Sequence, residues 1–266
     1  MKTYIINLAR AERRRRHVIC EAEKCGLDYE LVEAVEGTAL SETEIEEKCD
    51  LEVIRKFPNW LTKGMLGAAL SHRSVYKRII DEGDPAGFVL EDDVALSPDL
   101  VAVIAAAEKV IAENEVILFH YSSFEPLGLS RKGGIWLTDD RMIMYPMFLK
   151  GVVSAAGYMI SRGAAQSMYE WLLPIRLAPD SWLDFHLGGA VKNFRCVYPM
   201  PMNVIGAKST IEASNQSAAR VGITEFIDKH EIPILHPLFT RMRLKGLEKR
   251  ANFHVTEEES PLSPTR

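Results

Sequence analysis

Short apolar runs alternate with longer segments of helical character along this chain, and this alternation restricts its fold more than any other feature. The runs rich in the β-branched and aromatic residues typical of strands are residues 3–8, 29–37, 86–90 and 115–120. The segments with apolar side chains at helical spacing are residues 11–25, 61–83 and 99–114. Strand, helix and strand in this order predict an α/β fold with a mostly parallel central sheet flanked by helices.

Residues that favour helix ends set the expected boundaries of these helices. Gly26 and Gly83 follow helical segments and favour helix ends, because glycine readily adopts the left-handed conformation there. The stretch "SETE" at residues 41–44 fits a capping box that starts a helix. Ser97 followed by Pro98 predicts a helix start, with the proline in the first helical position.

The second half of the chain gives weaker signals. We expect strand and loop in residues 144–161, a helix from Ser161 that ends before Pro174, a short helix capped by Asp180, and strand and loop in residues 194–211. The domain prediction is one catalytic domain over residues 1–235. Residues 236–266 would then form a basic segment and a polar tail that we expect to be disordered.

Composition and charge exclude several classes of protein. A chain of 266 residues with 47% hydrophobic and 26% charged residues indicates one globular domain, neither a disordered nor a membrane-spanning protein. The net charge of -5 argues against a nucleic-acid binder. No CxxC pair and no secretory leader are found, so we expect reduced thiols in the cytoplasm and, at most, peripheral membrane contact.

Three consecutive acids follow the apolar run at residues 86–90. Glu91, Asp92 and Asp93 lie at the carboxyl end of a predicted strand, where open α/β sheets bind their ligands. Carboxylates at this spacing suit a divalent cation, which in turn can grip a diphosphate. An exposed strand-to-helix loop is the alternative interpretation.

A basic cluster follows the first predicted strand. Arg10, Arg13 and Arg14 lie around the junction of that strand and the first helix, a location suited to phosphate groups. A solvated helix face is the alternative when the cluster is taken alone. Acidic and basic clusters that both follow strands of one α/β chain together indicate a metal-bridged nucleotide site.

Several segments together resemble glycosyltransferase family 25. They include "YIINLARAERRRRHV", "LTKGMLGAALSHRSVYKRIIDEG", "AGFVLEDDVALSP" and "PIRLAPDSWLDF", in that order. The family comprises bacterial lipopolysaccharide and lipooligosaccharide β-galactosyltransferases and is similar to the collagen galactosyltransferase domains of animals. The resemblance spans residues 2–211 and implies a GT-A-like fold that binds a UDP-sugar donor with Mn²⁺ or Mg²⁺ and transfers the sugar, most simply galactose, to a glycan or glycolipid acceptor.

The resemblance also implies roles for individual residues. Asp93 would bind the metal directly, and Glu91 would contact the ribose or a metal-bound water, with Asp92 in the same group but without a task of its own. The other residues expected around the donor are Asn7, Leu8, Arg10, Arg14, Lys63, Gly64, Ser71 and His72. For His72 a purely structural hydrogen bond is an equal alternative.

The family inverts at the anomeric carbon, so the resemblance implies a carboxylate that acts as general base. We assign Asp180 as base and Asp184, one helical turn further, as the group that orients the acceptor. Asp180 as a mere N-cap is the alternative. Trp182 either stacks on an acceptor sugar or belongs to the core.

Two departures from the family pattern leave the donor sugar and the acceptor open. Many members have "GEIGC" where this chain has "GMLGA" at residues 64–68, and bacterial relatives often have "WGTAGY" where it has "VSAAGY" at residues 153–158. The rival hypotheses are a sugar nucleotidyltransferase and a non-catalytic member that binds a glycan or a nucleotide sugar. The first is disfavoured because "NLARAERR" has no glycine.

Three weaker candidates complete the sequence-based hypotheses. His120 and His236 are candidate pocket or metal residues. The basic segment at residues 240–250 suits the anionic inner face of the cytoplasmic membrane, although a solvated basic helix is the simpler interpretation.

Overall fold

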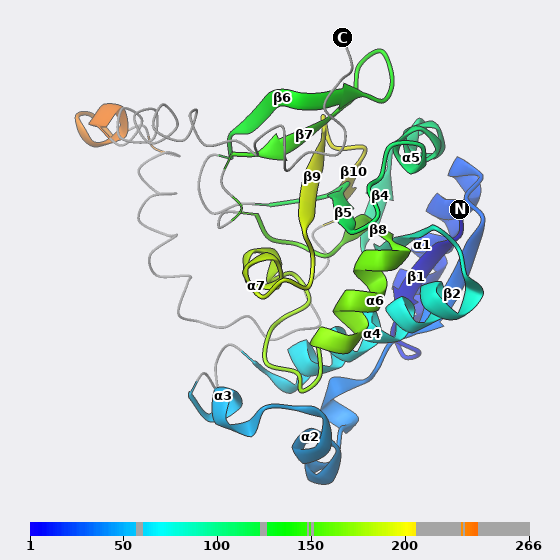
Figure 1. The fold of residues 1–266 in the computed structure, drawn as a ribbon, viewed down its shortest axis with the longest axis vertical. Coiled ribbons are helices and arrows are strands. Elements are labelled where there is room, and N and C mark those ends of the chain that lie inside the picture. The colour runs from blue at the N-terminus through cyan, green and yellow to red at the C-terminus, as the bar shows by residue number, and fades with distance from the viewer. Residues whose placement is uncertain are drawn as a thin grey trace.

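The computed structural model describes residues 1–56, 61–122, 127–147, 149, 152–205, 230 and 232–238. Its centre is an eight-stranded sheet with the strand order β2-β1-β3-β8-β5-β9-β7-β6 (Figure 1). The strands are β1 (Thr3–Asn7), β2 (Tyr29–Glu33), β3 (Ala86–Glu91), β5 (Glu115–Leu118), β6 (Leu129–Trp136), β7 (Met142–Pro146), β8 (Gly157–Ser161) and β9 (Asn193–Tyr198). Only β7 and β8 run against the direction shared by the other strands of this sheet, so the prediction of a mostly parallel sheet is confirmed.

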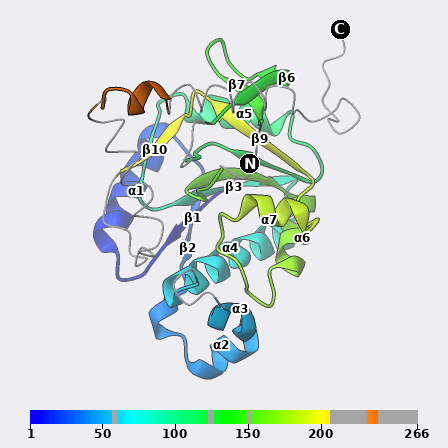
Figure 2. The ribbon, with the colours of Figure 1, turned by 90° about the vertical axis from the view of Figure 1, so that its left-hand side faces the viewer.

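Helices cover both faces of this sheet. The α-helices are α1 (Glu12–Cys25), α2 (Glu42–Lys48), α3 (Leu51–Lys56), α4 (Lys63–Glu82), α5 (Leu100–Glu108), α6 (Arg162–Trp171) and α7 (Trp182–Leu187). A 3-10 helix, η1, spans Gly37–Ala39, and the strands β4 (Val94–Leu96) and β10 (Met202–Val204) form a separate two-stranded sheet. Figure 2 shows α1 and α4 on opposite sides of β1 and β2.

The core divides along the sheet because side chains alternate between its faces. Tyr4 and Ile6 of β1 belong to the cluster that also holds the apolar faces of α4, α6 and α7. Ile5 belongs to the opposite cluster, with the apolar faces of α1 and α5. The resulting three-layer arrangement buries each strand of the sheet centre on both faces, which explains why these strands are apolar throughout.

Most of the predicted helix boundaries are confirmed. Gly26 and Gly83 end α1 and α4 in the left-handed conformation, with φ of 72° and 75°. The capping box at Ser41 and Glu44 is present, and the Ser161 side chain accepts the Ala164 N–H at the start of α6.

Two predicted helix starts are wrong. The helix expected at Pro98 begins at Leu100 and ends at Glu108, because the chain first forms β4, which pairs with the distant β10. Ser97 instead accepts a hydrogen bond from the Arg141 guanidinium at 3.1 Å. Asp180 does not cap α7, which begins at Trp182 after Ser181. In both cases a contact distant in sequence overrides a local capping signal.

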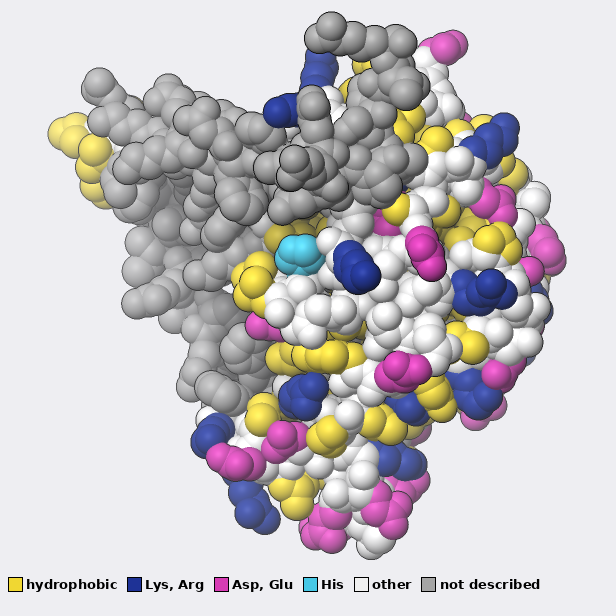
Figure 3. Space-filling model, viewed as in Figure 1, with side chains coloured by type: hydrophobic (Ala, Val, Ile, Leu, Met, Phe, Trp, Pro, Cys, Tyr) yellow, Lys and Arg dark blue, Asp and Glu magenta, His cyan; other side chains and the backbone are white. Residues whose placement is uncertain are grey.

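No helix among the residues that the structure describes is long and apolar enough to cross a membrane. Acidic and basic side chains are interspersed over the coloured part of the face in Figure 3. The four cysteines form no disulfide. The predicted basic segment at residues 240–250 and the polar tail lie outside the described residues, so the boundary at residue 236 stays a prediction.

Candidate functional site

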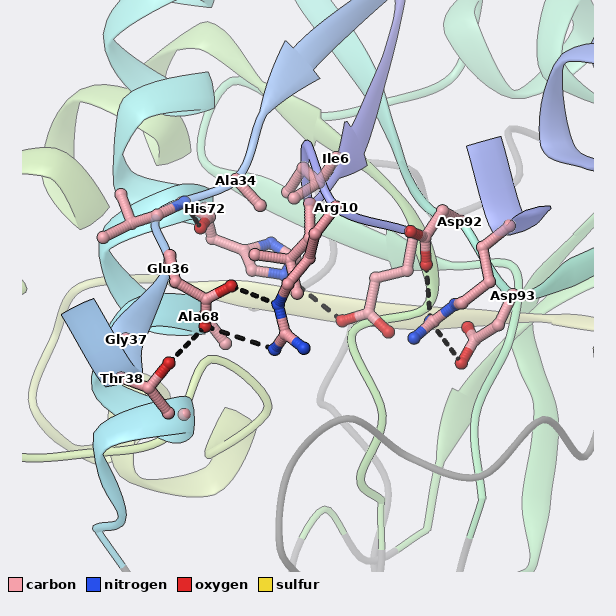
Figure 4. Close-up of a pocket in the computed structure, with 16 residues that line it drawn as sticks. Ile6, Arg10, Ala34, Glu36, Gly37, Thr38, Ala68, His72, Asp92 and Asp93 are labelled. Carbon is pink, nitrogen blue, oxygen red and sulfur yellow. Dashed lines mark hydrogen bonds and ion pairs between the residues drawn. The ribbon is translucent and has the colours of Figure 1, made fainter. Parts of the chain in front are cut away.

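An open cleft lies where the parallel strands β1, β2 and β3 end. It encloses about 760 Å³ of empty space, part of which is open to solvent. Figure 4 shows Arg10 with Glu36 on one side of the cleft and Asp92 with Asp93 on the other. The predicted site residues that line it are Leu8, Arg10, Arg14, Gly64, Ser71, His72, Glu91, Asp92 and Asp93. The structure therefore brings the acidic and basic clusters of the sequence together at one edge of the sheet.

Arg14 joins two of the three acids. Its Nη2 lies 2.5 Å from Asp92 Oδ1 and 2.7 Å from Asp93 Oδ2. The Asn7 side-chain amide, at the end of β1, donates to Asp92 Oδ2 at 2.6 Å. Asp92, which had no predicted task, thus anchors both Asn7 and Arg14. Arg13, by contrast, is exposed and does not line the cleft.

Burial and mutual repulsion perturb the remaining acids. Burial, together with the charge of Glu91, raises the pKa of Asp93 to about 6, although Arg14 opposes this shift. Asp93 Oδ1 is buried and has no hydrogen-bond partner. Such an oxygen is costly unless something positive or protic reaches it, so Asp93 is suited to a ligand.

The residues fit one kind of metal site. Among the described residues no group of three or more His, Cys, Asp or Glu side chains is arranged to hold a metal ion. Mg²⁺ at phosphate sites is held by one or two carboxylates together with substrate phosphates and water, and not by a complete protein cage. The free Oδ1 of Asp93, with Glu91 beside it in the cleft, meets that smaller requirement.

His72 is buried in the wall of the cleft and is held there by hydrogen bonds. Its Nδ1 lies 2.8 Å from the hydroxyl of Tyr158, which also contacts the Tyr76 hydroxyl at 2.9 Å. Its Nε2 faces Glu91 Oε1 at 3.4 Å. Ser71 has its hydroxyl committed to the backbone: it donates to the Gly67 carbonyl and accepts the Val35 N–H. The two members of the "SH" pair therefore hold the cleft wall together.

Glycines allow that wall to form. A Cβ on Gly67 would lie 2.6 Å from both the Gly37 nitrogen and the Val35 carbonyl oxygen. A Cβ on Gly37 would lie 1.9 Å from the Lys63 carbonyl oxygen. Only glycine at both positions lets the loop after β2 contact the first turns of α4.

This loop contributes residues that the sequence reasoning missed. Glu36 pairs with Arg10, with Oε1 3.2 Å from Arg10 Nη2, and accepts the Thr38 hydroxyl at 2.6 Å. The hydrogen bond from Arg10 lowers the pKa of Glu36. The signal was available, since the loop follows a predicted strand at the same edge of the sheet as the acids.

Lys63 lies outside the cleft lining. Its ammonium group donates to the Leu40 carbonyl at 3.3 Å, so the structure gives it a role in fixing the start of α4. Its contact with a donor stays a prediction.

Asp180 lies close to the cleft without lining it. Its Oδ2 accepts the Ser154 backbone N–H at 3.2 Å. Burial raises the pKa of Asp180, the charge of Glu91 raises it further, and the charge of His72 lowers it. These influences from two cleft residues connect Asp180 electrostatically with the site.

The other predicted acceptor residues have different surroundings. Asp184 is exposed on α7, and because Asp180 precedes that helix, helical spacing does not put the two on one face. Trp182 is fully buried and its Nε1 donates to the Ser154 carbonyl, so the proposed stacking on a sugar is wrong and the core alternative is correct. His120 Nδ1 lies 2.8 Å from Ser154 Oγ. His236 lies in residues 232–238, and its metal role stays a prediction.

A family model and several known proteins match parts of this chain. The model of glycosyltransferase family 25 (LPS biosynthesis protein) matches residues 1–183 of the 266. Human procollagen galactosyltransferase 2 is 32% identical over 96 residues, which are 34% of this chain and 15% of that protein. A glycosyltransferase 25 family member of Anopheles gambiae is 31% identical over 103 residues, 36% of this chain and 17% of that protein.

A bacterial relative matches over a longer stretch. The lacto-N-neotetraose biosynthesis glycosyltransferase LgtE of Neisseria meningitidis is 25% identical over 196 residues, 69% of this chain and 64% of that protein. The chain thus spans less than a fifth of the animal relatives and just under two thirds of the bacterial one. Because the family model matches more than half of the sequence and its segments form the cleft described above, the chain belongs to glycosyltransferase family 25.

Proposed function

We propose that this chain is an inverting glycosyltransferase that moves a sugar, most simply galactose, from a UDP-sugar to a hydroxyl of a lipopolysaccharide- or lipooligosaccharide-type glycan. The observation that carries the proposal is the cleft at the ends of β1 and β3, where Arg14, Asp92 and the unpartnered Asp93 Oδ1 meet. Galactose is supported by the names of the procollagen galactosyltransferases, and a bacterial glycan by that of LgtE.

In this proposal the cleft binds the donor. Arg10 and Arg14 face the diphosphate, because guanidinium groups bind phosphate oxygens well. Asn7 holds Asp92 and thereby Arg14 in place. Asp93 and Glu91 would hold a divalent cation, which when bound neutralises charge on the departing diphosphate.

Asp180 is the proposed base. Its carboxylate takes the proton from the acceptor hydroxyl, whose oxygen forms a bond to the anomeric carbon on the face opposite UDP. The bond between that carbon and the β-phosphate oxygen breaks, and its electron pair leaves with UDP. The raised pKa of Asp180 supports this role, because a base is most effective when its pKa approaches the working pH. Asp184, exposed beside it in sequence, remains our proposal for orienting the acceptor.

Turnover of UDP-galactose with MnCl₂ tests the proposal, with water as the acceptor. We expect wild type to release UDP and Asp180→Asn to bind the donor normally but lose at least ~100-fold in kcat, since general bases contribute about that much. Asp93→Ala should lose donor binding in Mn²⁺. Asp81→Asn removes an exposed carboxylate of α4 whose salt bridge, in the part of the chain that the structure describes, is to Lys77, and it serves as the control. Normal turnover in Asp180→Asn would refute the base assignment.

The donor sugar is identified by a thermal-shift screen of UDP-galactose, UDP-glucose and UDP-N-acetyl sugars with MnCl₂. A ligand at a hundred times its Kd stabilises the native state by about 2.7 kcal/mol, which shifts Tm measurably. We expect UDP-galactose to give the largest shift. Binding of any of these donors without turnover would favour the non-catalytic alternative.

We place the reaction in the cytoplasm, at the inner face of the cytoplasmic membrane. Four unpaired cysteines support a reducing compartment. Membrane contact would come from the basic segment at residues 240–250. Co-sedimentation with anionic liposomes should require this segment, and equal binding after its deletion would argue against the contact.

A further inference from the structure

Ser154 has a backbone conformation that residues other than glycine rarely adopt. Its φ is 98°, in the left-handed half of the map that favours glycine. The neighbouring chain is fixed on both sides, because Val153 pairs with Ser122 and Gly157 begins β8. The serine therefore retains a glycine-like conformation at a cost that other contacts must offset.

Every polar atom of Ser154 has a partner. The N–H donates to Asp180 Oδ2 at 3.2 Å, and the carbonyl accepts the Trp182 indole N–H at 3.0 Å. The hydroxyl oxygen accepts the Ala156 N–H at 3.3 Å and lies 2.8 Å from His120 Nδ1. Ser154 thus links the end of β5, the start of β8 and the segment before α7.

The hydroxyl contacts explain how a serine is held at positive φ. Because the hydroxyl oxygen already accepts from Ala156, its hydrogen is free to donate to His120 Nδ1. The Ser154 side chain is therefore held by Ala156 on one side and His120 on the other. Holding the side chain also fixes the direction of the Ser154 backbone N–H.

We propose that Ser154 is a positioning residue, which from its strained backbone conformation holds the Asp180 carboxylate for the acceptor hydroxyl. This inference rests on the proposed role of Asp180 as base. A hydrogen bond to Oδ2 fixes the plane of the carboxylate, and base catalysis is sensitive to such placement. The hydroxyl contacts with Ala156 and His120 hold the residue in this conformation.

Three substitutions of Ser154 separate the backbone from the side chain. Ser154→Gly keeps the N–H and adopts positive φ without strain. Ser154→Ala keeps a Cβ but loses the hydroxyl contacts that hold it. Ser154→Val adds a β-branched side chain, for which positive φ is most unfavourable. The measurements are kcat and KM for UDP-galactose hydrolysis with MnCl₂, beside thermal unfolding of each variant.

We expect kcat to be highest in wild type and Ser154→Gly, lower in Ser154→Ala and lowest in Ser154→Val. We expect Ser154→Gly within about fivefold of wild type, because glycine suits this conformation. Ser154→Val should lose about 100-fold in kcat, as expected for a misplaced catalytic group, with KM changed little. Should Ser154→Val not fold, the comparison of the glycine and alanine variants decides, because at ordinary positions glycine is the more harmful of the two.

The outcomes separate this inference from the proposed function. If Asp180→Asn is inactive but Ser154→Val or Ser154→Ala keeps the kcat of Ser154→Gly, the inference is overturned and the proposed function stands. If wild type does not turn over UDP-galactose, the proposed function fails, and crystal structures of the variants judge the inference. The bond from residue 154 to Asp180 should then persist in Ser154→Gly and be lost in Ser154→Val; its presence in both would overturn the inference.

Discussion

Two clusters of charge inside this molecule are built on opposite principles. In one, Glu115 and Arg195 are fully buried, and Arg195 reaches both carboxylate oxygens, with Nη2 2.7 Å from Oε2. Asn193 donates to the same carboxylate at 2.9 Å. In the other, which lies in the cleft, Arg14 pairs with Asp92 and Asp93, while Glu91 faces His72 Nε2 at 3.4 Å. Arg10, the other arginine that lines the cleft, pairs with Glu36.

The difference lies in charge balance. The buried pair joins one cation with one anion, and only Arg195 Nη1 lacks a hydrogen-bond partner. The cleft cluster leaves an excess of negative charge and an unpartnered Asp93 oxygen. A balanced cluster serves stability, whereas an unbalanced one at strand ends is a binding site whose cost is offset when the ligand arrives.

Arg195→Met should have the largest effect, because it leaves the carboxylate of Glu115 buried without its partner. Removing one member of a buried ion pair costs about 3 to 5 kcal/mol in the free energy of unfolding. Urea unfolding measures it. Arg131→Met, at an exposed position, is the control and should change stability by less than about 0.5 kcal/mol. A loss below about 1 kcal/mol for Arg195→Met would show that the pair is not structural.

Asp93→Asn should stabilise the protein at neutral pH, whereas Arg195→Met destabilises it. The pKa of Asp93 is raised from 3.8 to about 6 in the folded state, so the protonated form is favoured there. Below pH 4 both states are protonated and the carboxyl costs nothing. As the pH rises from about 4 through 6, the carboxyl ionises first in the unfolded state. The free energy of unfolding of wild type therefore falls by up to about 3 kcal/mol.

Urea unfolding in EDTA checks this prediction at pH 4 and pH 8. Asp93→Asn should be more stable than wild type at pH 8 and similar to it at pH 4, while donor binding is lost. Destabilisation of the same size at both pH values would contradict the view that the cleft is kept unsatisfied for a ligand.

Arg14→Gln gives a smaller effect, because Arg14 is partly exposed. Without this cation the acids lose their counter-charge, and we expect a loss of about 1 to 2 kcal/mol at pH 8 in EDTA. MgCl₂ should restore more stability to the variant than to wild type, since a divalent cation then neutralises the acids alone. Equal stabilisation of both proteins by MgCl₂ would count against a cation site.

Much of the fold was accessible from the sequence because its signals are local. Gly26, Gly83 and the Ser41 capping box act within one helical turn, and the structure agrees with each. The helix start predicted at Ser97 was wrong because β4, just before it, pairs with β10, more than a hundred residues away. Local capping preferences are worth about 1 kcal/mol and yield to such pairing.

The site divides in the same way. The acids and Arg14 were predicted together because strand ends gather at one edge of a parallel sheet. The contacts of Asp180 were not, because they depend on the positive φ of Ser154, a residue type that gives no local signal for this conformation. The burial of Trp182 was also not predictable from the sequence, because it depends on packing among α7, β8 and β9.

The most direct test of the central claim is calorimetric titration of UDP into the wild-type protein and into Asp93→Asn, each with MnCl₂ and with EDTA. We predict that wild type binds UDP more tightly in MnCl₂ than in EDTA and that Asp93→Asn shows no such difference. Equal affinity of wild type in both solutions, or a Mn²⁺ dependence that survives in Asp93→Asn, would contradict it.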